Sequence, residues 1–200
     1  MIKNLFYSIS CLLVIGCQSN NEPIEHSISK EIATLTDKKS QRAFLEKIAT
    51  SDQTVREEES TINQKYGYNS KEHQQAVQTQ IDTDKSNLAK IEAYLAKYGH
   101  PNKLDHGNRA FYAPWIVMHH APKETGTRRR NFKYLYDYYK KDELEQDRLN
   151  FFLGRMHQLE FGKRIRWNRS FTVQEEFDSL INVLDLREIA DEIDNPYKPN

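Results

Sequence analysis

The fold class of this chain is set by residues 37–98, DKKSQRAFLEKIATSDQTVREEESTINQKYGYNSKEHQQAVQTQIDTDKSNLAKIEAYLAKY. Apolar residues recur every three to four positions in it, which is the period of an amphipathic α-helix. One helix is predicted from Asp37, a good N-cap residue, to Tyr66, because Gly67 can end it. Its inward stripe is Leu45, Ile48, Asp52, Val55, Glu59, Ile62 and Tyr66.

A second helix is predicted over residues 70–98. Asn69 and Glu72 have the spacing of a capping box at its start, and Gly99 and Pro101 follow its end. Its inward stripe is Val77, Ile81, Asp84, Leu88, Ile91, Leu95 and Tyr98.

Helical patterns also cover most of the remaining chain. They span residues 109–120 with a possible break at Pro114, then 129–140, 143–161 and 172–194. We therefore predict an all-α fold, an irregular bundle of about five to six helices. The bundle forms a single domain over residues 30–195, and residues 196–200 are predicted to be a loose tail.

The N-terminal segment is short and apolar and ends at a cysteine. Lys3 precedes an apolar run, residues 5–15, that is too short to cross a bilayer as a stable helix. The run ends in Val14-Ile15-Gly16-Cys17, which resembles the lipobox of bacterial lipoproteins. The resemblance implies that residues 1–16 are a signal peptide, cleaved before Cys17, and that acyl chains such as palmitate on Cys17 attach the protein stably to a membrane. In the alternative, residues 1–16 are an ordinary signal peptide and Cys17 is incidental.

The composition fits an exported domain that is held together by its core. Cys11 lies in the segment to be removed and Cys17 would carry lipid, so the mature chain would have no thiol for disulfide, metal or nucleophilic chemistry. Polar residues 17–29 predict a flexible tether. Gln18 after the cysteine resembles the sorting signal of Gram-negative lipoproteins of the outer membrane. The net charge of +0, or −1 without residues 1–16, argues against a nucleic-acid partner.

Two carboxylates interrupt the inward stripes of the first two helices. Asp52 and Asp84 stand where the helical period calls for apolar residues, and burying a carboxylate is costly unless it is paired or hydrogen-bonded. Arg56, one turn after Asp52, could pair with it. Two interpretations follow. The carboxylates are exposed or form structural ion pairs, or they line a polar cleft between helices, as titratable groups at functional sites do.

Residues 143–161 pose a similar choice. Beside a core stripe of Leu149, Phe152, Met156 and Leu159 lies a second row, about a hundred degrees away, of Arg148, Phe151, Arg155 and Gln158, with Asp147 next to it. A guanidinium in that position can pair with a carboxylate of a neighbouring helix, which is the commoner outcome. It can equally hold an anionic ligand.

Polar motifs follow one another in a distinctive order between residues 43 and 164. They are Asp52-Gln53-x-x-Arg56, Asp84-x-x-Asn87, Gly99-His100-Pro101, His119-His120, Asp147-Arg148 and Gln158. This order resembles an uncharacterised bacterial family that carries DQxxR, DxxN, GxP, QH, DR and QxYGTQ motifs. The resemblance implies a shared polar set but no chemistry: Asp52, Arg56, Asp84, Asn87, His120, Asp147, Arg148 and Gln158. Two motifs depart from the family pattern, since His119 replaces glutamine and the ending after Gln158 has one extra residue and lacks the second glutamine.

Two classes of function fit this polar set. In the first, the protein is a binding or assembly module of the envelope whose cleft holds a peptide, a glycan fragment or a partner protein, with Arg56, Asn87, His119 and Gln158 as binding residues. In the second, it is a hydrolase with His120 as general base, oriented by Asp52, Asp84 or Asp147, and with Arg148 stabilising developing negative charge. No Gly-x-Ser-x-Gly nucleophile motif supports the second class.

A metal site is a weaker third hypothesis. His157-x-x-Glu160 places two metal-binding residue types on one helical face. Adjacent His119 and His120 project about a hundred degrees apart, so only one of them could join such a site. No two-histidine ligand motif of recognised spacing is present, and we expect neither a metal nor another cofactor.

Overall fold

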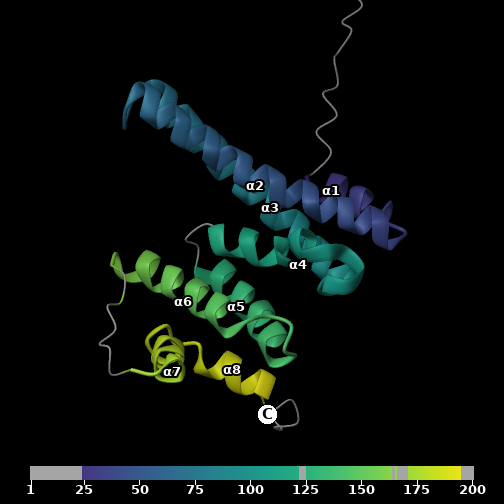
Figure 1. Cartoon of the computed structure of the whole chain (residues 1–200), viewed down its shortest axis with the longest axis vertical. Coiled ribbons are helices and arrows are strands. Elements are labelled where there is room, and N and C mark those ends of the chain that lie inside the picture. Colours follow the sequence, from purple (N-terminus) through teal and green to yellow (C-terminus); the bar gives the residue numbers. More distant parts are fainter. Residues whose placement is uncertain (1–23, 122–124, 164, 166–170, 195–200) are drawn as a thin grey trace, which may run out of the picture.

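The computed structural model describes residues 24–121, 125–163, 165 and 171–194 (Figure 1). These residues form eight α-helices and no strand, which confirms the all-α class but exceeds the predicted five to six helices. The predicted signal peptide, Cys17, the first part of the tether and the tail lie outside the described residues. Within the described ranges, no helix is both long enough and apolar enough to cross a membrane.

The two long helices form where the sequence predicts them, α2 (Lys38–Tyr66) and α3 (Lys71–Tyr98), and the structure packs them together as a hairpin. Asp37 caps α2 by accepting a hydrogen bond from the Ser40 amide at 2.7 Å, and the Ser40 hydroxyl accepts one from the Asp37 amide. The cap of α3 is Ser70 rather than the predicted Asn69. Asn69 instead occupies the left-handed region, with φ of 68°, because the tight turn between the helices requires a residue that tolerates it.

Helix α1 (Ile24–Ala33) corrects the prediction of a flexible tether at residues 17–29, because the described part of that segment is helical. Ile28 and Ile32 lie one helical turn apart, and both are buried together with Leu35. The Tyr98 hydroxyl on α3 lies 2.9 Å from the Ile32 carbonyl oxygen and 2.8 Å from that of Leu35. Burial of this short apolar stripe against α3 outweighs the polar composition around it.

Helix α4 (Lys103–His120) starts earlier than the predicted residue 109, because the Asn102 side chain caps it and accepts hydrogen bonds from the next amides. Its kink lies at Gly107, with φ of 75°, and not at the predicted Pro114. Helix α5 (Thr125–Lys140) and helix α6 (Gln146–Phe161) follow close to their predicted ranges.

The predicted helix over residues 172–194 is divided in two, α7 (Val173–Val183) and α8 (Arg187–Asp194). Asp185 between them has φ of 54°, which ends the first helix. Figure 1 shows α4 between the α2–α3 hairpin on one side and α5 and α6 on the other, with α7 and α8 beyond them. The C-terminal end of α4 therefore lies at the centre of the arrangement, between the long hairpin and α6.

Candidate functional site

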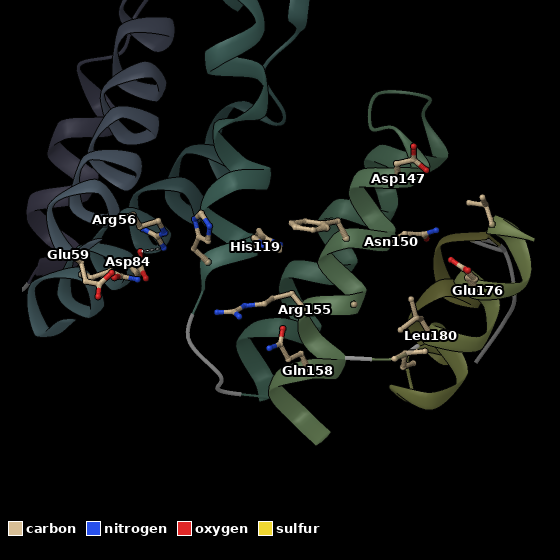
Figure 2. A pocket seen from close by; sticks show the side chains of 16 residues that line it. Arg56, Glu59, Asp84, His119, Asp147, Asn150, Arg155, Gln158, Glu176 and Leu180 are labelled. Atoms are coloured by element: carbon tan, nitrogen blue, oxygen red, sulfur yellow. Dashed lines mark hydrogen bonds and ion pairs between the residues drawn. The ribbon is translucent and has the colours of Figure 1, made fainter. Parts of the chain in front are cut away.

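A polar cavity of about 700 Å³ lies between α2, α3, α4, α6 and α7 (Figure 2). It brings together six of the residues predicted from sequence: Arg56, Asp84, His119, His120, Asp147 and Gln158. Its lining also includes residues that the sequence did not identify as site residues, among them Glu59, Gln80, Asn150, Arg155 and Glu176. No serine, threonine, cysteine or tyrosine is among the described lining residues, so none of them offers a hydroxyl or thiol nucleophile.

Asp52 orients His120 from behind the cavity wall. The Asp52 side chain is fully buried, and its Oδ2 and Oδ1 atoms lie 2.9 and 3.1 Å from His120 Nδ1. The side-chain Nε2 of Gln53 donates a further hydrogen bond to Asp52 Oδ2 at 2.7 Å. Because a carboxylate only accepts, Nδ1 carries the donated proton. The second ring nitrogen of His120, Nε2, can therefore accept a proton, and the His120 side chain lines the cavity.

Arg56 connects α2 to α3 beside this pair. Its Nη1 donates to the main-chain oxygen of Asp52 at 2.8 Å, and its Nη2 donates to Asp84 Oδ1 at 2.7 Å. Burial raises the pKa of Asp84 above its usual 3.8, and the nearby positive charge of Arg56 opposes that shift. Both stripe carboxylates are therefore ion-paired, and Asp84 also lines the cavity.

His119 forms part of an aromatic wall of the cavity. Its ring stacks against both Trp115 and Phe151, with ring centroids 5.5 and 4.7 Å away, and those two rings also contact each other at 6.3 Å. Burial, together with the positive charges of His120, Arg155, Arg128 and Arg56, lowers the pKa of His119 to about 3, so the ring is neutral near pH 7. The Nδ1 atom of His119 is buried and has no hydrogen-bond partner among the described residues.

Arg155 extends from α6 into the cavity, toward the side formed by α2, α3 and α4 (Figure 2). Its Nε atom is buried, and the described part of the chain provides it with no hydrogen bond or ion pair. Asn150, which also lines the cavity from α6, likewise has a buried Oδ1 atom without a partner among the described residues. The sequence placed Arg155 in the second row of α6 but could not distinguish it from Arg148.

Besides Asp52, two more predicted residues are not part of the cavity lining. Arg148 bonds Glu145 at 3.0 Å, and its guanidinium lies 3.8 Å from the ring centroid of Tyr112. It is thus held outside the cavity, where it cannot stabilise charge on a ligand. Asn87 is buried in α3 behind the wall, and its Nδ2 atom has no partner.

Within the described ranges, no three histidine, cysteine, aspartate or glutamate side chains gather in a way that could hold a metal ion. His157, the centre of the metal hypothesis, has its Nδ1 atom 3.0 Å from the main-chain oxygen of Lys163. That ring therefore contributes to ending α6, beside Phe161.

Comparison of the chain with known protein families, with curated proteins and with solved structures finds no significant match in any of the three. The resemblances described from the sequence stay predictions, and the chemistry of the cavity is argued from its own geometry.

Proposed function

We propose that the protein is a bacterial envelope lipoprotein, anchored in the outer membrane through lipid on Cys17. We propose further that its cavity binds a peptide or a glycan fragment. One observation carries the binding proposal. Three buried polar atoms of cavity-lining residues have no partner among the described residues: His119 Nδ1, Asn150 Oδ1 and Arg155 Nε. Buried polar atoms in folded proteins are nearly always hydrogen-bonded, so their presence in the lining marks the cavity as a site for a polar partner.

The size of the cavity supports a small ligand. Its volume of about 700 Å³ lies within the range typical of small-molecule sites, roughly 300–1,000 Å³. Phe151 is 55 % exposed and lies next to the His119 ring, so it offers an apolar face to a sugar ring or a side chain. Polar groups around an aromatic face suit a ligand that is itself partly polar.

Filling the cavity tests the binding proposal. Gly154 lines it, and a Cβ atom at this position would meet nothing within 4 Å, so Gly154→Leu places a side chain in open space. Gly126→Leu on α5 is the matched control, because it also meets nothing and lies outside the lining. Calorimetric titration of the full chain with peptidoglycan fragments should show binding that Gly154→Leu weakens at least tenfold and Gly126→Leu leaves unchanged. Equal binding by both variants, or no binding by the unaltered chain, contradicts the proposal.

The lipid anchor has a separate test. Mass spectrometry of the protein purified from bacterial membranes should find acyl chains on Cys17 and no residues before it. Cys17→Ser should move the protein out of the membrane fraction. Membrane retention of this variant would contradict anchoring through Cys17.

The pair of Asp52 and His120 supports a second candidate, a hydrolase. A histidine whose Nδ1 is held by a carboxylate can accept a proton at Nε2 from an attacking water and return it to the leaving group. The described lining holds no hydroxyl or thiol nucleophile, so water would attack directly. Chromatography of the same peptidoglycan fragments after incubation would reveal cleavage that His120→Ala abolishes in protein that is still folded. Cleavage that persists in His120→Ala rules out this candidate and leaves the binding proposal intact.

A further inference from the structure

Arg155 carries a positive charge that the described residues do not neutralise. Its side chain is partly buried, and no carboxylate lies within ion-pairing distance of it in the described ranges. Removing a guanidinium from water without a partner is costly, and side chains of this kind are normally paired. The unpaired state therefore calls for a partner from outside the chain.

The acids on the side of the cavity toward which Arg155 points are already engaged. Asp84 bonds Arg56 at 2.7 Å, and Glu59 Oε1 lies 2.7 Å from His73 Nε2. Asp52 is occupied by His120 and lies behind the wall. None of these carboxylates is free to turn toward Arg155 without breaking an existing contact.

The other acids of the cavity lie across α6. In Figure 2, Asp147 and Glu176 stand on the α7 side of that helix, whereas the guanidinium of Arg155 extends to the opposite side. The cavity is thus divided by helix α6. The side facing α2, α3 and α4 holds the unpaired guanidinium of Arg155, and the α7 side carries the carboxylates of Asp147 and Glu176.

We infer that Arg155 is an anion-binding residue, and that the cavity ligand carries a phosphate or carboxylate group that lies against it. This inference rests on the proposed function and adds the chemical class of the ligand. The planar guanidinium donates two parallel hydrogen bonds to either group, and partial burial strengthens the contact. His119, which is neutral near pH 7, lines the same cavity.

The same helix provides a matched control. Arg148 has the same side chain, but it is paired with Glu145, covers the Tyr112 ring and lies outside the cavity lining. Arg155→Gln and Arg148→Gln each remove one positive charge from α6. Only Arg155→Gln removes the charge that faces the cavity. A general effect of net charge would weaken anion binding equally in both variants, whereas a local effect would weaken it only in Arg155→Gln.

The experiment is calorimetric titration of the full chain in detergent, at constant ionic strength, with inorganic phosphate and separately with acetate. We expect millimolar binding of at least one anion, weakened about tenfold or more in Arg155→Gln and unchanged in Arg148→Gln, since a hydrogen bond to a charged group is worth a factor of that order. Binding of phosphate alone assigns a phosphate-bearing ligand, and binding of acetate alone assigns a carboxylate.

Two results would overturn the inference: no binding of either anion, or equal loss in both variants. The proposed function would stand after either result, provided that neutral glycan fragments still bind the unaltered chain and no longer bind Gly154→Leu. If Gly154→Leu has no effect on any fragment while Arg155→Gln still loses the anion, the proposed function fails and the anion site stands.

Discussion

His120 Nδ1 at the end of α4 lies 2.9 Å from Asp52 Oδ2 on α2, although the two residues are 68 positions apart in the sequence. Asp52 also receives a hydrogen bond from Gln53 and lies 3.4 Å from Arg56 Nη1. One buried carboxylate therefore holds the imidazole and helps to hold the guanidinium that reaches α3. The orientation of His120 in the cavity depends on this carboxylate.

Asp52→Ala is expected to destabilise the fold by about 2 to 3 kcal/mol, because it leaves the His120 and Gln53 side chains without their buried acceptor and removes one of the two carboxylates beside Arg56. Urea unfolding measures the change in the free energy of unfolding. Glu46→Ala is the control on the same helix, since Glu46 pairs with Arg42 at the surface and such pairs contribute less than about 1 kcal/mol. Similar losses of unfolding free energy in both variants would show that Asp52 contributes no more to stability than a surface ion pair does.

His119 is expected to make stability depend on pH. Its pKa is lowered from 6.5 to about 3, so between these values the unfolded chain binds a proton that the folded chain does not. The free energy of unfolding therefore falls as pH drops from 6.5 toward 3, by up to about 1.4 kcal/mol per pH unit. His119→Phe keeps an aromatic ring against Trp115 and Phe151 and should flatten this dependence in urea unfolding measured at several pH values.

Other groups with shifted pKa values titrate in the same pH range and remain in that variant, among them His100 and Asp84. Burial lowers the pKa of His100 to about 4, which adds a dependence of the same sign. The raised pKa of Asp84 has the opposite sign, because the unfolded chain loses that proton first and stability falls as pH rises above 3.8. The relevant quantity is thus the difference between the unaltered chain and His119→Phe. Parallel curves would contradict a lowered pKa at His119.

Gly154→Ala is expected to stabilise the protein by about 0.4 to 1 kcal/mol. Gly154 lies within α6, and an added Cβ would meet nothing within 4 Å. Alanine then lowers the entropy of the unfolded chain without strain. Thermal unfolding should show a higher melting temperature. Gly67→Ala, where φ is 86°, should lower it, because alanine is strained in that backbone conformation.

Tyr98→Phe is expected to loosen α1 locally. The Tyr98 hydroxyl contacts the carbonyl oxygens of Ile32 and Leu35, where α1 ends, and a hydrogen bond of this kind contributes about 1 kcal/mol. Hydrogen exchange should become faster in residues 28–35 and stay unchanged in α6. Tyr68→Phe at the 76 % exposed tip of the hairpin should change neither region. Unaltered exchange in α1 of Tyr98→Phe would show that apolar packing alone holds the helix.

The sequence predicted most helices because their causes are local. Caps such as Asp37 act on amides three residues away, and amphipathic period is a property of neighbouring turns. The end of α7 and the presence of α1 were harder to predict. Asp185 ends α7 in the left-handed region, which an aspartate adopts only occasionally, and α1 depends on a few isoleucines in a polar stretch.

The sequence by itself determined the all-α class, the two long helices α2 and α3, and six of the polar positions that line the cavity. Tertiary structure alone decided which polar side chains meet. Arg148 and Arg155 share one row of α6, yet only Arg155 reaches the cavity, because Glu145 and Tyr112 hold Arg148 elsewhere. The physical reason is that helix formation depends on contacts within a few residues, whereas the rotation and packing of helices depend on contacts between distant segments such as Asp52 and His120.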